Sequence, residues 1–416
     1  MMVGLADCNN FFVSCERSRN GALKGIPVVV LSNNDGCVVA RSNEAKSMGI
    51  KMGQPAFEIR DHILSGKLTA LSGNHLLYRE ISIKVHDIFR RHVPKTIDYS
   101  VDEAFLLVDE IPERYLRSIG ERIVREALES LDIPVTVGFA PSKTLAKLVT
   151  DECKHTGKSV GVLAEGDRET AEKLLRETPV RELWGVGRRQ AAKLYTAGIY
   201  TAADFAARDL VWIRKQLGIN GEKMWRELNG EHCIELNHVD RPLQDSISET
   251  RTFPMDVTDY DYLRARIAIY AADCAARLRK MQGVAGEITV FLSTNPFNQR
   301  FAGYHPSATH RFADPVYDTV SIVTTANNLL NRIFNPEIPF KRGGVILGDI
   351  RPDRRLVSLF MTEEEIHREN VNRRLMNALD HLNPNVGRSC VKLASQMTSG
   401  HPGHNDGYSS SFQSPK

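Results

Sequence analysis

The sequence lacks the features that mark a membrane, secreted or strongly basic protein. No apolar run approaches the roughly 20 residues that a membrane-spanning helix needs, and no basic, apolar and cleavable signal segment opens the chain. The formal net charge of +3 is too small to indicate a nucleic-acid partner by itself. We therefore expect a cytoplasmic protein without a membrane partner, whose function has to be argued from local motifs.

Paired cysteines are also missing. The seven cysteines are odd in number, scattered along the chain, and never spaced as C-x-x-C. Disulfide frameworks and zinc sites both depend on such regular spacings. We therefore expect reduced thiols and no zinc site.

The first 165 residues are predicted to form a layered α/β domain, one of about two to four domains expected from the length. Short apolar runs predict strands at 3–6, 27–31, 37–40, 96–108 and 133–138. Turn signals and helical spacing predict helices near 9–15, 43–48, 77–88, 116–127 and 142–154. We expect an antiparallel sheet backed by helices on one face. The last helix would carry Lys143, Lys147 and Lys154 on its polar side.

Three acids interrupt this apolar pattern. Asp7 follows the first predicted strand, and Asp102 and Glu103 lie inside the β-branched and aromatic run at 96–108. A carboxylate beside a core strand is costly unless a cation meets it. Converging carboxylates form the hard oxygen site that Mg²⁺ accepts. Structural acids in turns are the alternative for any one residue, but the adjacent pair favours a metal site.

Residues 166–240 have a different texture, with short helical stretches broken by glycines. Gly185 and Gly187, followed by Arg188, Arg189 and Lys193, have the form of a helix-hairpin-helix. A glycine turn at a helix N-terminus presents backbone N–H groups to a phosphate, and the basic side chains neutralise backbone charge without reading bases. A tight turn between two helices explains the glycines equally well.

Residues 242–352 predict a small α+β domain, with strands at 286–293, 319–323 and 344–350 and helices at 262–281 and 326–334. Its scattered arginines and lysines could form a basic face, and solvated surface charge is an equal alternative. Beyond it, Leu356 to Phe360 is an apolar pentamer between charged flanks. It could dock in a partner's groove or pack back as a strand. A helix is predicted at 370–382, and the tail from Ser399 is predicted to be disordered.

Five motifs in this order resemble those of the Y-family translesion DNA polymerases. They are Asp7-x-Asn9-x-Phe11-Phe12-x-Ser14-x-Glu16, Pro27-Val-Val-Val-Leu-Ser-Asn-Asn-Asp-Gly-Cys37, Tyr99-Ser-Val-Asp-Glu-Ala104, Ser142-Lys-Thr-Leu-Ala-Lys147 and Trp184-Gly-Val-Gly-Arg188. The stretch 377–388 is typical of the UmuC-type branch, which the chain resembles most. The resemblance implies error-prone, SOS-type DNA synthesis past damaged bases, by two-metal-ion nucleotidyl transfer from a dNTP to a primer 3′-hydroxyl.

The same resemblance implies an α+β multidomain fold shaped like a right-hand polymerase. The palm would comprise residues 1–11 and 73–165, and the small fingers 12–72. A helix-hairpin-helix thumb would follow at 166–240 and a DNA-binding α+β little finger at 242–352. Residues 353–416 would form a partner-binding segment with a disordered tail.

Site residues carry over where this sequence matches the family motifs. Asp7 and Asp102 would bridge two Mg²⁺ ions, Glu103 would serve mainly the catalytic one, and the backbone carbonyl of Cys8 would add an oxygen. The nucleotide would meet residues of the fingers and palm, namely Phe11, Phe12, Arg41, Asn43, Lys46 and Lys154. Among these, Phe12 would be the steric gate that excludes a ribose 2′-hydroxyl, with Phe11 packed beside it. Lys46 and Lys154 would contact the triphosphate, and Arg41 would compensate for Asn43, which replaces a tyrosine common in other branches.

Partners are implied by resemblance alone: primer–template DNA, a UmuD-type cleaved accessory dimer, a sliding clamp and a recombinase filament. The clamp motif of the family is Gln-Leu-x-Leu-Phe, and the segment Leu356, Val357, Ser358, Leu359 and Phe360 fits it except at the glutamine position. The loss of that amide is expected to weaken docking. Two other functions stay open, a palm-domain nucleotidyl cyclase and a non-catalytic scaffold at damaged primer ends. A cyclase would need neither the glycine hairpin nor the domain after residue 242, and a scaffold would be expected to have lost the acids.

Overall fold

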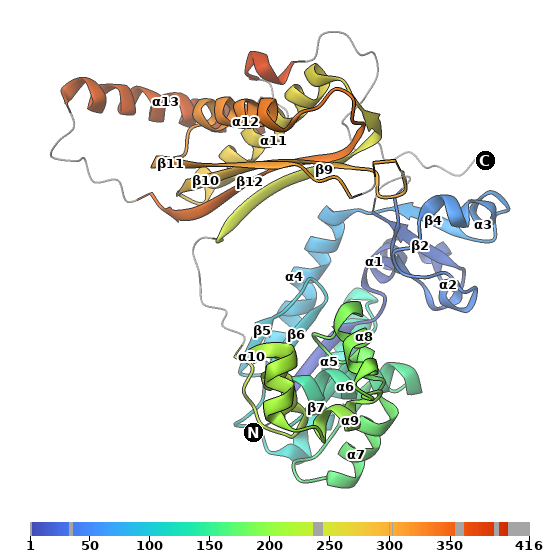
Figure 1. The fold of residues 1–416 in the computed structure, drawn as a ribbon. Helices are drawn as coiled ribbons and strands as arrows, with labels where there is room; N and C mark the ends of the chain where they lie inside the picture. Colours follow the sequence, from blue (N-terminus) through green and yellow to red (C-terminus); the bar gives the residue numbers. More distant parts are fainter. Residues whose placement is uncertain are drawn as a thin grey trace. The chain divides into compact units, whose positions relative to one another are not determined.

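The computed structural model describes residues 2–32, 36–235, 244–298, 300–301, 303–353, 362–386 and 391–397. The described residues fall into two compact units, one up to residue 235 and the other from residue 244 (Figure 1). None of the helices in these ranges is long and apolar enough to cross a membrane. The segment from Leu356 to Phe360 and the tail from Ser399 lie outside the described residues.

The first unit is built around a sheet with the strand order β5-β6-β1-β7-β8. Its strands are β1 Val3–Cys8, β5 Lys95–Asp98, β6 Glu103–Leu107, β7 Val135–Ala140 and β8 Val160–Val162. The central strand β1 pairs antiparallel with both β6 and β7, whereas β8 runs parallel to β7. The predicted run 96–108 is therefore a hairpin, and its turn carries Asp102.

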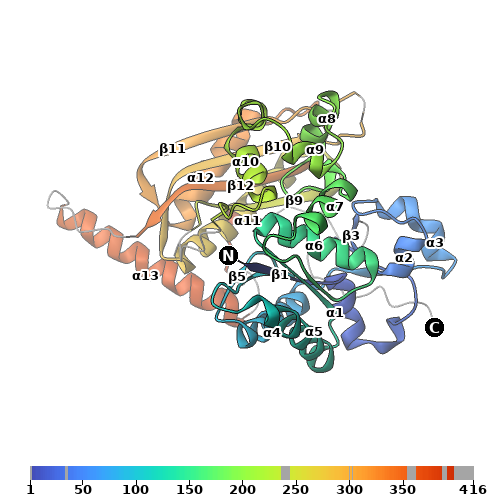
Figure 2. The same ribbon diagram turned by 90° about the horizontal axis from the view of Figure 1, so that it is seen from below.

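Helices cover both faces of this sheet, so the prediction of helices on one face is wrong. The helices α4 His75–His92 and α5 Leu116–Leu131 pack on one side of β1, and α6 Lys143–Thr156 packs on the other (Figure 2). Every residue of β1 is buried. A strand that is buried on both faces is apolar throughout instead of alternating. The run from Val3 to Ala6 has this pattern, so helices on both faces agree with the local sequence.

A smaller sheet in the first unit has the order β3-β2-β4. Its strands are β2 Val28–Leu31, β3 Val38–Arg41 and β4 Thr69–Ser72, and the helices around it are α1 Phe11–Arg19, α2 Asn43–Ser47 and α3 Arg60–Leu64. This sheet occupies the region predicted as the fingers. Ser42 caps the N-terminus of α2, because its hydroxyl accepts a hydrogen bond from the Ala45 N–H at 3.2 Å.

The described part of the region predicted as the thumb contains four α-helices: α7 Arg168–Glu177, α8 Arg188–Thr196, α9 Ala202–Ala206 and α10 Leu210–Leu228. The end of α10 packs against the start of α6 and buries Lys143, which was predicted on the polar side of α6. The Lys143 ammonium donates to the Ile234 carbonyl at 2.7 Å and contacts His232 Nε2 at 2.9 Å. Buried Glu227 accepts from the backbone N–H groups of Thr144 and Ile234. Helical periodicity alone could not identify this tertiary partner.

The second unit places the helices α11 Tyr260–Lys280 and α12 Thr319–Ile333 on one face of a sheet with the order β11-β10-β12-β9 (Figure 1). Its strands are β9 Ser246–Val257, β10 Gly283–Thr294, β11 Ser307–Val316 and β12 Phe340–Pro352. The helix α13 Glu363–Val386 and the short 3-10 helix Ala394–Gln396 complete the described part of this unit.

Residues 319–323, predicted as a strand, form the first turns of α12. The Asp318 carboxylate caps this helix by accepting the Ser321 N–H at 2.8 Å. Ile322 and Val323 begin an apolar face that packs in the core. The β-branched residues favoured a strand, but the cap and the tertiary packing outweigh that weak preference. The edge strands β9 and β11 were not predicted, because their exposed polar residues hide the apolar pattern.

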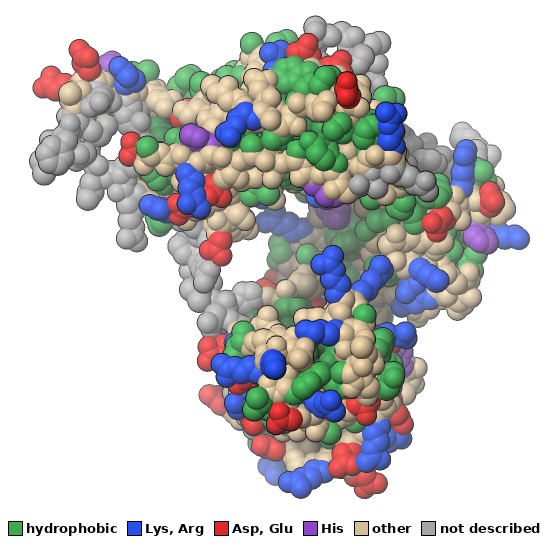
Figure 3. Space-filling view, viewed as in Figure 1, with side chains coloured by type: hydrophobic (Ala, Val, Ile, Leu, Met, Phe, Trp, Pro, Cys, Tyr) green, Lys and Arg blue, Asp and Glu red, His purple; other side chains and the backbone are tan. Residues whose placement is uncertain are grey.

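Acidic and basic side chains are interspersed over the face of each unit in view (Figure 3). In the second unit, Arg311 pairs with Glu287 at 3.0 Å, and Arg279 pairs with Asp380 at 2.6 Å. Pairing of this kind favours the solvated and structural account of these arginines over a basic face.

Candidate active site

The three predicted metal ligands meet at one end of the central strands. Asp7 on β1 lies directly opposite Glu103 on β6, a position that brings Cβ atoms to about 4.5–5.5 Å. Asp102 precedes β6, and its backbone carbonyl accepts the Cys8 N–H at 2.9 Å. Asp7 is buried, whereas Asp102 and Glu103 are partly exposed. Strand pairing therefore unites acids that are far apart in the sequence.

Two lysines from one face of α6 contact these acids. Lys154 Nζ lies 2.6 Å from Asp7 Oδ2, and Lys147 Nζ lies 2.7 Å from Glu103 Oε1. The two lysines are separated by two helical turns, so they lie on the same side of α6. Lys154 was predicted as a phosphate contact. Lys147 was placed only on the polar side of its helix, and its pairing with Glu103 was missed.

Burial and the lysines act on the acids in opposite directions. Burial raises the pKa of Asp7 to about 7, against the opposing effect of Lys154. Burial would also raise the pKa of Glu103, but the charge and hydrogen bond of Lys147 outweigh it and hold that pKa below its ordinary value. Asp7 therefore depends on a nearby cation to stay ionised at neutral pH.

Ser100 orients the acidic pair, which the sequence analysis did not recognise. Its hydroxyl donates to Asp102 Oδ1 at 2.6 Å and accepts the Glu103 N–H at 3.1 Å. The sequence does contain a signal for this role, because a serine precedes Asp102 by two residues and Glu103 by three. In turns, serine hydroxyls commonly bond the backbone of the residues that follow. Ser100 thereby limits the rotation of the Asp102 carboxylate.

The donor set suits a hard divalent cation. Asp7, Asp102 and Glu103 offer carboxylate oxygens, the ligands that Mg²⁺ prefers. The Cys8 side chain is buried in the core, so this residue can offer only its backbone carbonyl. Among the residues that the structure describes, no group of three or more His, Cys, Asp or Glu side chains is already arranged around a common metal position. Two of the three acids are paired with lysines instead.

A cavity of about 280 Å³ adjoins Lys154. Among the described residues, its lining is rich in amide, hydroxyl and ammonium groups and includes no carboxylate: Asn9, Asn10, Asn43, Lys46, Thr136, Cys153, Lys154, Gly157, Lys158 and Ser159. The cavity therefore suits an anion. Asn10 donates to the Asn43 side chain at 3.0 Å, which links α1 to α2. Burial, with the charges of Arg41 and Lys154, lowers the pKa of Lys46.

Three of the predicted nucleotide-binding residues, Asn43, Lys46 and Lys154, line this cavity. Arg41 does not, and its guanidinium donates to the Ile50 carbonyl. Sequence reasoning missed Asn10, Thr136 and Lys158. No separate sequence signal marked these residues, because the fold alone brings them to the cavity.

The Phe12 ring packs against two aromatic neighbours, Phe11 and Tyr78. Its ring stacks on Tyr78 of α4, with 4.3 Å between the ring centroids and 14° between the ring planes. The Tyr78 hydroxyl donates to Glu16 at 2.7 Å, and Phe11 packs beside Phe12 with its own side chain buried. Tyr78, on one ring face, and Phe11, beside the ring, therefore fix the position of Phe12.

The glycine hairpin precedes α8 as predicted. Gly185 has a φ of +94°, a left-handed conformation that favours glycine, and Gly187 is the N-cap of α8. Arg188 and Arg189 are exposed in the first turn of α8. Lys193 instead donates to the Gln216 carbonyl at 2.8 Å.

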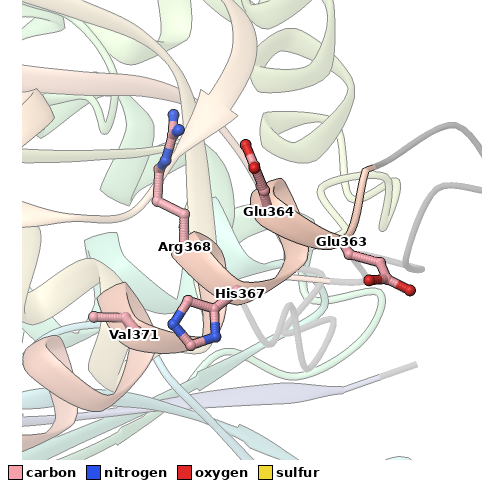
Figure 4. Close-up of a pocket in the computed structure, with 5 residues that line it drawn as sticks. All are labelled: Glu363, Glu364, His367, Arg368 and Val371. Carbon is pink, nitrogen blue, oxygen red and sulfur yellow. The ribbon is translucent and has the colours of Figure 1, made fainter.

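A second hollow, of about 570 Å³, lies in the other unit on the surface of α13 (Figure 4). It is lined by Glu363, Glu364, His367, Arg368 and Val371. All five residues come from one helix, so no second element in the described part of the chain encloses a ligand there. We therefore do not consider it a candidate active site.

Comparison with known proteins identifies the family. Residues 6–151 match the impB/mucB/samB family, residues 244–358 match the C-terminal domain of that family, and residues 168–199 match the IMS family HHH motif. The chain is 35% identical to Protein ImpB of Salmonella typhimurium over 401 residues, which cover 95% of this chain and 93% of the relative. It is also 35% identical to Protein UmuC of Salmonella typhimurium strain LT2, with the same shares covered. DNA polymerase IV 1 of Bacillus subtilis strain 168 is 29% identical over 69% of this chain and 68% of its own length.

Solved structures confirm the predicted fold class. A Y-family DNA polymerase chimera of Dbh and Dpo4 matches with a TM-score of 0.69 and 23% identity over 85% of this chain and 100% of its own. An insertion ternary complex of Dbh DNA polymerase matches with a TM-score of 0.53 over the same shares. With the family matches and the Salmonella relatives, these likenesses show that the chain belongs to the impB/mucB/samB family and is a UmuC-type Y-family translesion DNA polymerase.

Proposed function

We propose that Asp7, Asp102 and Glu103 hold two Mg²⁺ ions for nucleotidyl transfer from a dNTP to a primer 3′-hydroxyl. The observation that carries this proposal is the position of Lys154, which contacts Asp7 at 2.6 Å and also lines the cavity that suits an anion. A triphosphate in that cavity would lie beside the acids. Bound Mg²⁺ would activate the primer hydroxyl and stabilise both the attacking and the leaving oxygens.

The side chains around the proposed metal site have separate roles in this proposal. Lys154, Lys46 and Lys158 neutralise the triphosphate, and Asn10 and Asn43 offer amide groups at the cavity wall. Ser100 keeps Asp102 oriented through its 2.6 Å hydrogen bond. Phe12 lies under the sugar as the steric gate. Arg41, held by the Ile50 carbonyl, acts on the phosphates through its charge near Lys46.

Primer extension in the presence and absence of Mg²⁺ tests the proposed function. We expect the purified full chain, supplied with a sliding clamp and a UmuD-type accessory dimer, to extend a primer past an abasic template position with dNTPs and Mg²⁺. Removal of the metal with EDTA should abolish extension, and added Mg²⁺ should restore it, because the proposed ions would activate the primer hydroxyl and stabilise the leaving oxygen. Extension that survives chelation would contradict the metal mechanism.

The thumb hairpin is proposed to bind the DNA backbone. Gly185 would present its backbone N–H group, and Gly187 would do so by releasing the Gln190 side chain, to which its N–H donates at 3.4 Å. Arg188 and Arg189 would add positive charge in the first turn of α8. Arg188→Ala and Arg189→Ala should each weaken primer–template binding to a similar degree for all sequences. Each should reduce the slope of log affinity against log salt by about 1.

Fluorescence anisotropy over a salt series measures both quantities. Arg176→Ala is a matched control, because Arg176 is an exposed thumb arginine on α7 that pairs with Glu172. An unchanged salt slope for both hairpin variants would remove the hairpin from the DNA interface.

The domain boundaries and the remaining partners are proposals from family resemblance. We assign the palm to 1–11 and 73–165, the fingers to 12–72, the thumb to 166–240 and the little finger to 242–352. Residues 353–416 would bind the accessory dimer, the recombinase filament and, through 356–360, the clamp. A cytoplasmic location stays a prediction.

A further inference from the structure

Three aromatic rings connect the glycine hairpin of the thumb to the strand that carries the acids. Trp184, next to Gly185 in the hairpin, donates its indole N–H to the Tyr99 hydroxyl at 2.9 Å. The two rings meet edge to face, with centroids 5.5 Å apart and planes at 88°. Phe105 of β6 packs against both, at 5.5 Å from Tyr99 and 5.8 Å from Trp184. Tyr99 lies in the turn just before Asp102 and Glu103.

Lys147 lies between this aromatic cluster and Glu103. Its ammonium is 5.0 Å from the centroid of the Tyr99 ring and 5.8 Å from that of Trp184, within the distance of about 6 Å at which rings attract cations. On its other side it contacts Glu103 at 2.7 Å. The side chains of Lys147 and Glu103 are only 16% and 17% exposed. Little room therefore remains for either group to turn away while the rings stay in place.

We infer that Trp184 is a positioning residue that couples DNA binding by the thumb hairpin to the orientation of Glu103 through Tyr99 and Lys147. The inference rests on the proposed function, in which the hairpin binds the DNA backbone and Glu103 binds metal. A phosphate bound at the Gly185 N–H, next to Trp184, restrains the indole. The restrained indole holds Tyr99 and Lys147, and these hold the Glu103 carboxylate ready for the ion. Because such coupling is reciprocal, DNA tightens metal binding and metal tightens DNA binding by the same factor.

Binding of Mn²⁺, followed through the electron paramagnetic resonance signal of the free ion, measures this coupling without relying on activity. The full chain is titrated with and without primer–template DNA. In the wild type, DNA should tighten Mn²⁺ binding. Trp184→Ala should lose about tenfold in Mn²⁺ affinity with DNA present, the lower end of the 10- to 100-fold loss typical of residues that orient metal ligands. Its affinity without DNA should change much less.

Two conservative variants separate this role from a merely structural one. Trp184→Phe keeps a ring beside Lys147 and removes the indole donor, and Tyr99→Phe keeps its ring and removes the acceptor. Each should reduce the DNA-dependent tightening, and the double variant should be no worse than either single one, because all three delete the same hydrogen bond. Trp225→Phe is the matched control, because the Trp225 indole donates to the Arg208 carbonyl elsewhere in the thumb.

If Trp184→Ala folds poorly, Trp184→Phe and Tyr99→Phe still test whether Trp184 positions Glu103. Additive effects of these variants, or DNA-dependent tightening equal to the wild type in all of them, would overturn the inference and leave the proposed function intact. If the Asp102→Asn variant bound Mn²⁺ as tightly as the wild type, the metal site itself would be misassigned and the proposed function would fail with it.

Discussion

Asp102→Asn should reduce primer extension by on the order of 10³-fold or more. The amide keeps the size of the side chain and removes the negative charge proposed to be shared by two ions. Loss of the charge stabilisation that a correctly held ion supplies, about 4 kcal/mol or more, corresponds to this factor in rate. Single-turnover extension with saturating dNTP and Mg²⁺ measures the effect on chemistry separately from DNA binding.

The matched control is Asp109→Asn, which makes the same change at an exposed acid just beyond the other end of β6. It should extend primers at the wild-type rate. Asp102→Asn should also bind primer–template DNA and unfold at a temperature close to that of the wild type, because Asp102 is partly exposed and the Ser100 hydroxyl can still bond the amide oxygen. Undiminished extension by this variant would refute the assignment of the acids and favour a scaffold function.

Phe12→Ala should allow ribonucleotides to enter, raising the kcat/KM for an rNTP relative to the matching dNTP by on the order of 10²-fold. The ring is proposed to exclude the 2′-hydroxyl by contact, and exclusion requires that the ring cannot retreat. Tyr78 blocks that retreat, since it stacks on Phe12 at 4.3 Å and is tied to Glu16 at 2.7 Å. Competition between rNTP and dNTP in primer extension measures the ratio.

Phe57→Ala provides the comparison, because Phe57 lies in the same predicted fingers region but is 72% exposed. This control should leave sugar selection unchanged. If the rNTP preference of Phe12→Ala also matched the wild type, the steric gate would have to be another residue.

Local patterns predicted most elements of the first unit. Apolar runs located β1, β2 and β7, and helical spacing located α4 and α5. The patterns failed where tertiary contacts compete with local preference. Residues 319–323 are β-branched and yet helical, because a cap at Asp318 and an apolar face toward the core favour α12. The edge strands β9 and β11 carry too many exposed polar residues to show an apolar pattern.

The site shows the same division. Ordered motifs named Asp7, Asp102 and Glu103 and the family, because each chemical role needs a particular residue type in a particular local setting. The partners of these residues could not be read from the sequence. Lys143, Lys147 and Lys154 were all predicted on the polar side of α6, but Lys143 is buried. Nothing in helical spacing indicates which lysine meets which acid.

The sequence by itself determined which residue types are available for the proposed chemistry: carboxylates for metal, an aromatic ring for the sugar, and a glycine turn with arginines for the DNA backbone. Only the tertiary structure decided that Asp7 faces Glu103 across paired strands, that Lys154 contacts Asp7 and also lines the cavity, and that Trp184 in the hairpin before α8 contacts Tyr99. The physical reason is the sequence distance over which each kind of interaction acts. Residue type and local spacing act over a few positions, whereas these contacts depend on strand register and helix packing between segments far apart in the chain.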